Sequence, residues 1–155
     1  MVRIDRKDPK WLQRFVDQYK TGEVLAVGWP AGPAASIKYP DGEQVAMVAA
    51  VNNYGSASRG IPARPFMTEG GAAAVEATRP IKEKLIPKLN KGRIKVAQIL
   101  EVMGPFAVAA VQRKIKDGNW EPNAPATAAA KGSDTPLKDT GLMSQSITYV
   151  VRPGK

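Results

Sequence analysis

The sequence predicts one α+β domain over residues 1–155, in which a small antiparallel sheet packs against two long kinked helices. Short strand-like segments lie near both ends of the chain, at Glu23–Trp29 and Ser146–Arg152. Two long helical stretches, Phe66–Lys91 and Arg93–Lys116, contain prolines that should bend them. Regions rich in glycine, proline and small polar residues predict long loops, and the chain length is usual for a single domain.

The N-terminal part should contribute a helix and one or two strands. Pro9–Lys20 has apolar residues at helical spacing, with Asp8 as a candidate N-cap and Gly22 as its end. Glu23–Trp29 is apolar, partly β-branched and bounded by turn residues, so we expect a strand there. Ser36–Tyr39 is a candidate for a second short strand.

A further helix is expected over Glu43–Asn53. Asp41, with Gln44 three residues later, resembles a capping box at the start of this helix. The helix should stop at the Tyr54–Gly55 corner, because glycine readily adopts the backbone angles that end a helix. A flexible loop of glycine and serine then leads to Phe66.

Interruptions decide the expected shape of the two long helices. Each interior proline costs about 3 kcal/mol relative to alanine, so Gly70-Gly71, Pro80 and Pro87 predict a kinked or broken helix with its lysines outward. The second stretch is apolar almost all round from Val96 to Val111, which indicates a buried central helix. We expect it to bend at Gly104-Pro105.

The C-terminal part should begin with a long loop. Asp117–Pro136 is rich in small and turn-forming residues, and one helical turn is expected near Ala126–Ala130. A short helix over Lys138–Gln145 should follow. Ser146–Arg152 alternates like a strand, and its natural partner is Glu23–Trp29.

Composition argues against several classes of function. The chain has no cysteine and no histidine, which excludes disulfides and thiolate metal sites and removes the commonest general base. We therefore expect no enzyme, no cofactor and no metal. No run of roughly 20 apolar residues suggests a membrane span, and the charged N-terminus does not resemble a secretory signal.

Three motifs that resemble catalytic sites lack the context that their chemistry needs. Asp139-Thr140-Gly141 matches the aspartic-protease triplet, but no strand pattern flanks it, so capping of a short helix is the simpler interpretation. Gly55–Gly60 is flexible yet lacks the lysine of a phosphate-binding loop. Ser144 and Ser146 have no histidine as a base, and a pairing with Lys138 has no support.

Positive charge is concentrated in one part of the chain. The net charge is +9, and ten basic residues lie between Arg79 and Lys116 against only Glu83 and Glu101. Such a field attracts polyanions, although a solvated helix face is the equal alternative. The candidate DNA-facing residues are Lys82, Lys84, Lys88, Lys91, Arg93, Lys95, Arg113, Lys114 and Lys116.

The segment Ile61-Pro62-Ala63-Arg64-Pro65-Phe66 predicts a stiff arm, because proline fixes φ and restricts the preceding residue. Arg64 and Phe66 would project from this arm and dock on another subunit. An internal clamp on a carboxylate is the alternative for Arg64. Trp120, in the long loop, is a candidate interface anchor, whereas Trp11 and Trp29 are interpreted as core residues.

Two stretches of the chain carry a resemblance to a known family. The first contains Asn52-Asn53-Tyr54-Gly55 and then Ile61-Pro62-Ala63-Arg64-Pro65-Phe66. The second contains Pro125-Ala126-Thr127, Lys131-Gly132-Ser133-Asp134, Pro136-Leu137-Lys138-Asp139-Thr140-Gly141-Leu142 and Ser146-Ile147-Thr148-Tyr149. With Val27-Gly28 and Tyr39-Pro40, the order and spacing resemble the tail-completion family of tailed bacteriophages, also described as tail-terminator, neck or virion-morphogenesis proteins. The likeness runs from about Glu23 to Val151, and Asn53 departs from the acidic residue usual in the family.

The resemblance implies a structural virion protein located at the head–tail junction, and in the host cytoplasm during assembly. It would form a homo-oligomeric ring, a hexamer by this resemblance, that completes the tail and binds the tail tube protein and the head connector, with genomic DNA crossing the channel. The arm and the Asn119–Asp139 loop would make the contacts. The expected interface residues are Tyr54, Arg59, Ile61, Pro62, Arg64, Pro65, Phe66, Trp120 and Asp139.

A non-specific nucleic-acid-binding module, acting as a monomer or dimer, is the alternative. A small hydrolase is disfavoured because histidine and cysteine are missing. The mass of the protein in solution, and its presence or absence in particles, would separate the ring from the nucleic-acid-binding module.

Overall fold

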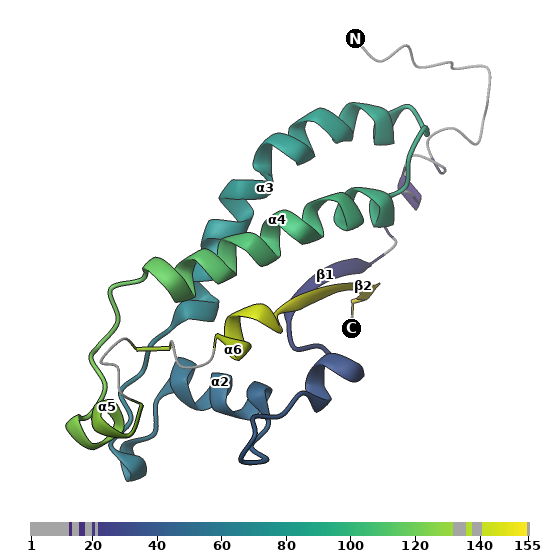
Figure 1. The fold of residues 1–155 in the computed structure, drawn as a ribbon. Helices are drawn as coiled ribbons and strands as arrows, with labels where there is room; N and C mark the ends of the chain where they lie inside the picture. Colours follow the sequence, from purple (N-terminus) through teal and green to yellow (C-terminus); the bar gives the residue numbers. More distant parts are fainter. Residues whose placement is uncertain are drawn as a thin grey trace, which may run out of the picture.

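A computed structural model describes Gln13, Val16, Asp17, Lys20 and residues 22–131, 136–137 and 141–154 (Figure 1). The expected helix Pro9–Lys20 falls mostly outside these residues, and so does Asp139. All the elements below belong to the described part of the chain.

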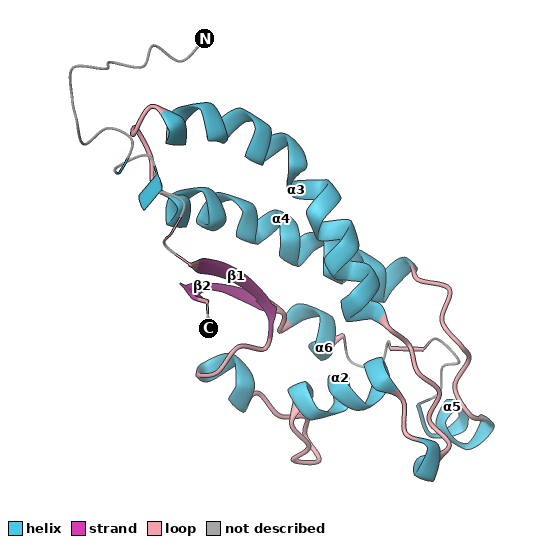
Figure 2. Ribbon diagram, turned by 180° about the vertical axis from the view of Figure 1, so that it is seen from behind, coloured by secondary structure: helices cyan, strands magenta, loops and turns pink. Residues whose placement is uncertain are grey.

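The two strands lie near opposite ends of the chain and form one antiparallel sheet. β1 (Glu23–Gly28) pairs with β2 (Thr148–Pro153), with Glu23 opposite Pro153 and Gly28 opposite Thr148. The expected pairing of these two segments is confirmed. The sheet therefore joins the beginning of the described fold to its end (Figure 2).

Two long helices, α3 (Phe66–Asn90) and α4 (Val96–Asp117), form a hairpin that covers the sheet. α4 lies between α3 and the strands, and it contacts both of them (Figure 1). The expected α+β architecture is confirmed.

Small residues let these layers approach closely. A Cβ atom on Gly70 of α3 would lie 3.0 Å from the Cα of Val111 on α4. A Cβ atom on Gly104 would overlap the ring of Tyr149 in β2. Glycine is therefore needed at both positions for α4 to fit between its neighbours.

The prolines do not end the two long helices. Pro80 and Pro87 lie inside α3, and Pro105 lies inside α4; all three are exposed. Because proline has no N–H, the carbonyl four residues earlier loses its helical donor. These carbonyls belong to three exposed glutamates, Glu76, Glu83 and Glu101. Water can satisfy these carbonyls, so α3 stays continuous while its axis bends (Figure 1).

Three shorter helices surround one end of the hairpin. They are α2 (Val45–Tyr54), α5 (Pro125–Lys131) and α6 (Leu142–Gln145). α5 confirms the helical turn expected near Ala126–Ala130. α6 is the described part of the expected helix Lys138–Gln145.

Two local expectations are wrong. Ser36–Tyr39 is not a strand, because a 3-10 helix occupies Pro33–Ser36 and only Lys38 forms a single bridge, to Gln44. The capping box is also absent, because α2 begins at Val45 and Gln44 is its N-cap without a side-chain hydrogen bond. Asp41 instead accepts a hydrogen bond from the Glu43 N–H at 3.0 Å, which stabilises the turn before the helix.

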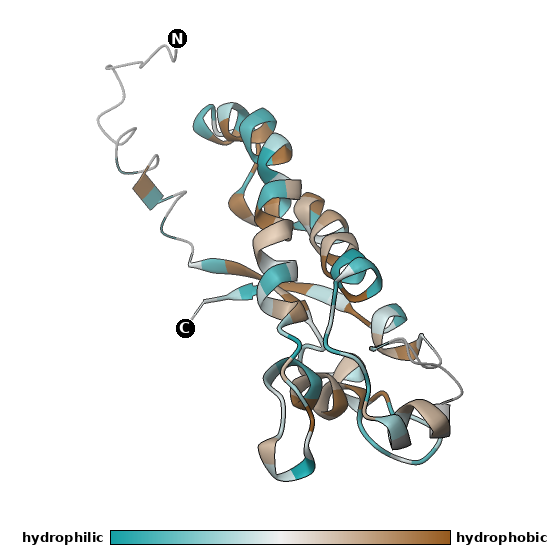
Figure 3. Cartoon of the chain, turned by 90° about the vertical axis from the view of Figure 1, so that its left-hand side faces the viewer, coloured by the Kyte–Doolittle hydropathy of each residue, from teal (hydrophilic) through white to brown (hydrophobic). Residues whose placement is uncertain are grey.

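The main core lies where α2, α6 and the adjoining ends of α3 and α4 meet. Phe66 and Val45 are fully buried there, and Trp29 and Trp120 pack against its edge. The remaining buried members are Ala49, Val111, Ile115, Leu137, Met143 and Ile147. The opposite end of the hairpin extends away from this core and carries many hydrophilic residues (Figure 3).

Candidate functional site

Arg64 occupies a buried site between three segments of the same chain. Its side chain is 3% exposed. Nε donates to the Glu121 carbonyl at 2.8 Å, and Nη2 donates to the Pro122 carbonyl at 3.0 Å. Nη1 donates to Asn52 Oδ1 at 3.0 Å, and Nη2 also reaches Asn123 Oδ1 at 3.4 Å. The guanidinium therefore fastens the 121–123 loop to the end of α2.

Neutral oxygens, rather than a carboxylate, hold this cation. Burial lowers the pKa of Arg64, and the nearby charge of Glu121 opposes that shift. Arginine remains protonated because its ordinary pKa lies far above neutrality. The planar fork matches several carbonyl and amide oxygens at once, so the arrangement stabilises a buried charge without an ion pair among the described residues.

The neighbouring asparagines complete this framework. Asn52 accepts the Arg64 backbone N–H at its carbonyl, with a distance of 2.8 Å. Asn53 is buried, and its Oδ1 accepts the Met67 N–H at 3.0 Å. That bond satisfies a free donor at the start of α3, where Pro65 provides no side-chain cap. Gly55 has φ +75°, and a Cβ atom there would lie 2.8 Å from the Ala63 nitrogen.

The structure corrects the expected role of the arm. Arg64 and Phe66 do not project from the molecule, since both side chains are buried in their own chain. The prolines stiffen the segment but aim these side chains inward, because the backbone returns along α2 to Asn52. The alternative of an internal clamp is the better description of Arg64, with carbonyl and amide oxygens in place of a carboxylate.

Other expected interface residues are divided between surface and interior. Trp120 is half-buried, and its Nε1 donates to the Lys114 carbonyl at 3.1 Å, so it closes the end of α4 rather than projecting as a free anchor. Ile61 and Pro62 are half-buried. Tyr54, Arg59 and Pro65 are exposed. Asp139 lies outside the described residues.

The basic residues form two groups rather than one band. Lys82, Lys84 and Lys88 on α3, with Lys91, Arg93 and Lys95 in the turn that follows, surround the tip of the hairpin, and all six are exposed. The other group, Arg113, Lys114 and Lys116, lies at the far end of α4, about 27 Å away at 1.5 Å per helical residue. Lys114 is also paired with Glu69, with Nζ 3.2 Å from Oε2.

The tip has an unusually positive environment. No acidic residue occurs between Lys84 and Leu100. The C-terminus of α3 and the N-terminus of α4 both lie here, so their opposite helix dipoles offset each other and the six cations dominate the local field. A bound anion would relieve the repulsion among these cations, so the tip is the part of the described surface best suited to a polyanion.

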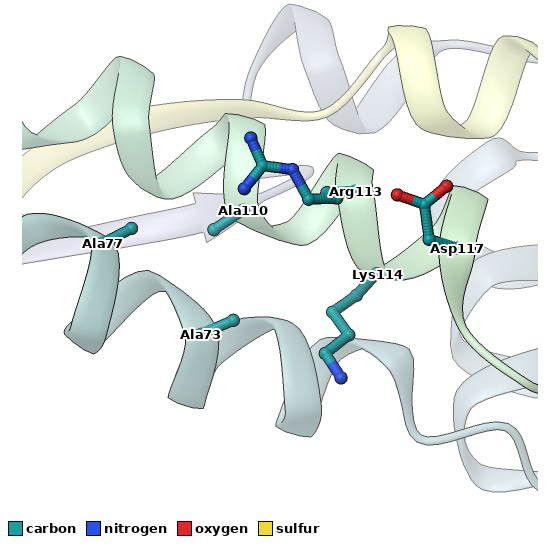
Figure 4. Close-up of a pocket in the computed structure, with 6 residues that line it drawn as sticks. All are labelled: Ala73, Ala77, Ala110, Arg113, Lys114 and Asp117. Atoms are coloured by element: carbon teal, nitrogen blue, oxygen red, sulfur yellow. The ribbon is translucent and has the colours of Figure 1, made fainter.

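Two cavities among the described residues contain little that could perform catalysis. One, of about 200 Å³ between α3 and α4, is lined by Ala73, Ala77, Ala110, Arg113, Lys114 and Asp117 (Figure 4). A second, of about 490 Å³ beside the Arg64 framework, is lined mainly by glycine, proline and loop residues. Neither combines a nucleophile with a base.

Large apolar side chains are exposed in pairs on two helices, α2 and α4, and only Tyr54 among them is an interface residue predicted from the sequence. Tyr54 and Met47 on α2 are 80% and 62% exposed, and Phe106 and Val102 on α4 are 53% and 48% exposed. One signal was present, because α2 contains no charged residue although it lies at the surface. In α4 the same apolar character was interpreted as complete burial.

Several classes of site are absent from the described part of the chain. No three carboxylates gather there as potential metal ligands. None of its helices has the length and apolar character needed to cross a membrane. Comparisons with protein-family models, with curated proteins and with solved structures find no match to this chain.

Proposed function

We propose that this chain is a structural virion protein of a tailed bacteriophage, which forms a ring at the head–tail junction and completes the tail. The observation that carries the proposal is the convergence of the two stretches that resemble the tail-completion family. Phe66 from the first stretch and Leu137 and Ile147 from the second enter the same core cluster. The two stretches that carry the resemblance therefore pack together in one core, as expected if both belong to the same family fold.

The proposed mechanism is binding without catalysis. The chain would assemble with copies of itself, with a tail tube protein on one side and a head connector on the other, first in the host cytoplasm and then in the virion. Exposed apolar side chains on α2 and α4 support an assembly role, because such surfaces commonly mark protein interfaces. A ring of identical subunits needs two different faces on each copy.

The hairpin tip is the part of this protein that we assign to genomic DNA. Its six exposed cations would lie toward the channel and balance phosphate charge, without reading base sequence. The second basic group, at the far end of α4, points to a different part of the assembly because the length of the helix separates the two.

Deletion of the coding sequence from a phage genome that carries it tests the proposal. We expect heads and tails that remain unjoined or tails of abnormal length, with normal particles restored by the intact protein. A labelled subunit should appear at the head–tail junction in images of the restored particles. Normal infectious particles without the protein would contradict the proposed function.

A non-specific nucleic-acid-binding module remains a second candidate, and the hairpin tip is the observation that favours it. Both candidates allow DNA binding, so binding alone does not separate them. A free monomer or dimer that binds DNA tightly at low salt and never enters particles would support the second candidate. Incorporation into particles in a fixed copy number would support the ring.

A further inference from the structure

Each exposed apolar face forms a stripe along its helix. On α2 the stripe is Met47, Ala50 and Tyr54, spaced three and four residues apart, and all three are exposed. We call it the α2 stripe. On α4 the stripe is Val102, Phe106 and Ala109, with the same total length of seven residues. We call it the α4 stripe. Each spans about 10 Å at 1.5 Å per residue.

The two stripes point away from each other. Val45 and Ala49, on the opposite side of α2 from the α2 stripe, are buried in the main core. Val111 and Ile115, on the opposite side of α4 from the α4 stripe, enter the same core. The stripes therefore lie on opposite sides of one packed cluster, which is the arrangement that a head-to-tail contact between identical copies needs.

The charges at the ends of the stripes give the contact a direction. Asp41 and Glu43 are exposed just before α2, with Lys38 near them. Arg113 is exposed one turn after Ala109 on α4. In an antiparallel arrangement Glu43 would lie beside Arg113.

A parallel arrangement would match charges at one end of the stripes only. It would place Asp41 near Lys95 at that end, but Arg59 near Arg113 at the other, where both charges are positive. Complementary charges fix orientation and suppress wrong pairings, so the antiparallel arrangement is favoured.

We propose that the α2 stripe of one copy docks antiparallel on the α4 stripe of the next copy, with Met47 near Ala109, Ala50 near Phe106 and Tyr54 near Val102. This inference rests on the proposed assembly of identical subunits and names its interface. The equal stripe lengths, their opposite directions and the matching end charges select a second copy as the occupant. The contact replaces the Arg64–Phe66 arm, which the fold uses internally.

A mixing experiment tests the head-to-tail geometry. Met47→Asp and Phe106→Asp each place a charge in one stripe, so we expect each variant to be monomeric, with at least a tenfold loss of association in sedimentation. Each variant keeps one intact stripe, and the mixture should therefore form a complex of two chains. Val75→Asp on α3 is the matched control, because Val75 is exposed and apolar but lies outside both stripes. The fold of every variant is checked by its unfolding midpoint.

Two results would overturn this geometry. One is a wild-type protein that stays monomeric at the highest concentration measured. The other is a mixture of the two variants that forms no complex.

Cross-linking tests the direction of the contact. Because the chain has no native cysteine, only the introduced cysteines can react. Tyr54→Cys mixed with Val102→Cys should cross-link through a short bis-maleimide at least tenfold more than Tyr54→Cys mixed with Ala109→Cys. The reverse preference overturns the antiparallel arrangement.

Particles that incorporate Met47→Asp normally would refute the interface but leave the proposed function intact. If the protein assembles through the stripes but never enters particles, the interface is supported and the proposed function is refuted.

Discussion

The segment from Asn52 to Phe66 and the α3–α4 hairpin differ in where their most distinctive residues lie. The first segment resembles an external arm, yet its arginine and phenylalanine are buried in their own chain. The hairpin contains a helix apolar almost all round, yet that helix exposes Val102 and Phe106. The comparison teaches that a rigid segment is not necessarily an outward one, and that apolar character does not by itself mean burial.

Arg64→Ala should produce the largest effect, because the inward segment depends on this side chain. The change leaves the Glu121 and Pro122 carbonyls and Asn52 Oδ1 without their donor. We expect a loss of about 3 kcal/mol in the free energy of unfolding, measured by urea denaturation. Arg59→Ala is the matched control, since Arg59 is exposed nearby, and it should change stability by less than about 0.5 kcal/mol. Equal losses would show that Arg64 is not a clamp.

Neutralising the hairpin tip should weaken DNA binding and leave the fold intact. The expected loss in binding free energy is slightly smaller than the loss of folding stability in Arg64→Ala. The triple change of Lys88, Lys91 and Arg93 to glutamine removes three exposed cations. The slope of log affinity against log salt should fall by about 2.7, at 0.9 for each phosphate that the protein no longer neutralises. Binding to a short random duplex, measured between low and moderate salt, gives this slope.

The control for the tip replaces equally exposed cations elsewhere in the fold. Lys38, Arg59 and Lys116 are exposed and lie outside the tip, and changing all three to glutamine keeps the same net charge as the tip variant. If the control lowers the slope as much as the tip variant, the net charge of the protein, not the tip, governs binding.

Two glycines of the hairpin allow a comparison between a closely packed site and an open one. Gly104→Ala should destabilise the fold by about 2 kcal/mol, because its new methyl group meets the ring of Tyr149. Gly71→Ala, in α3, meets nothing within 4 Å, and should stabilise the helix by about 0.5 kcal/mol. Thermal unfolding of both variants measures the difference. Two changes of the same sign would contradict the packing of α4 against β2.

Local patterns were sufficient to predict the sheet and the two long helices. The strands are short apolar segments bounded by turns, and the expected pairing of Ser146–Arg152 with Glu23–Trp29 is the one that forms. The continuity of α3 through Pro80 and Pro87 was less predictable, because it depends on the exposure of Glu76 and Glu83, whose carbonyls lose a helical N–H partner. Burial around a helix is decided by the assembled fold, not by the helix sequence.

The position of Arg64 could not be predicted from its flanks. Its partners at Glu121 and Pro122 lie 57 and 58 residues away, in a loop with no marked pattern. The prolines determine local backbone angles, but the direction of the segment follows from the Arg64 N–H bond to Asn52. For the exposed stripe of α4 the difficulty was the reverse, since a helix apolar on every side does not indicate which side faces water.

Tyr149 provides the smallest test, at the contact between the hairpin and the sheet. Burial raises the pKa of Tyr149, and the charge of Glu101 and its hydrogen bond with the tyrosine add to that effect. A raised pKa in the folded state means that the related stability is complete below the unfolded value of about 10 and is lost as pH rises through the folded value. Wild-type stability should therefore fall slightly more steeply above pH 10 than that of Tyr149→Phe, measured by urea denaturation. Tyr54→Phe, which removes a tyrosine from an exposed site, should leave the steeper fall in place. Identical pH profiles for all three proteins would mean that neither burial nor Glu101 raises the pKa of Tyr149 at this contact.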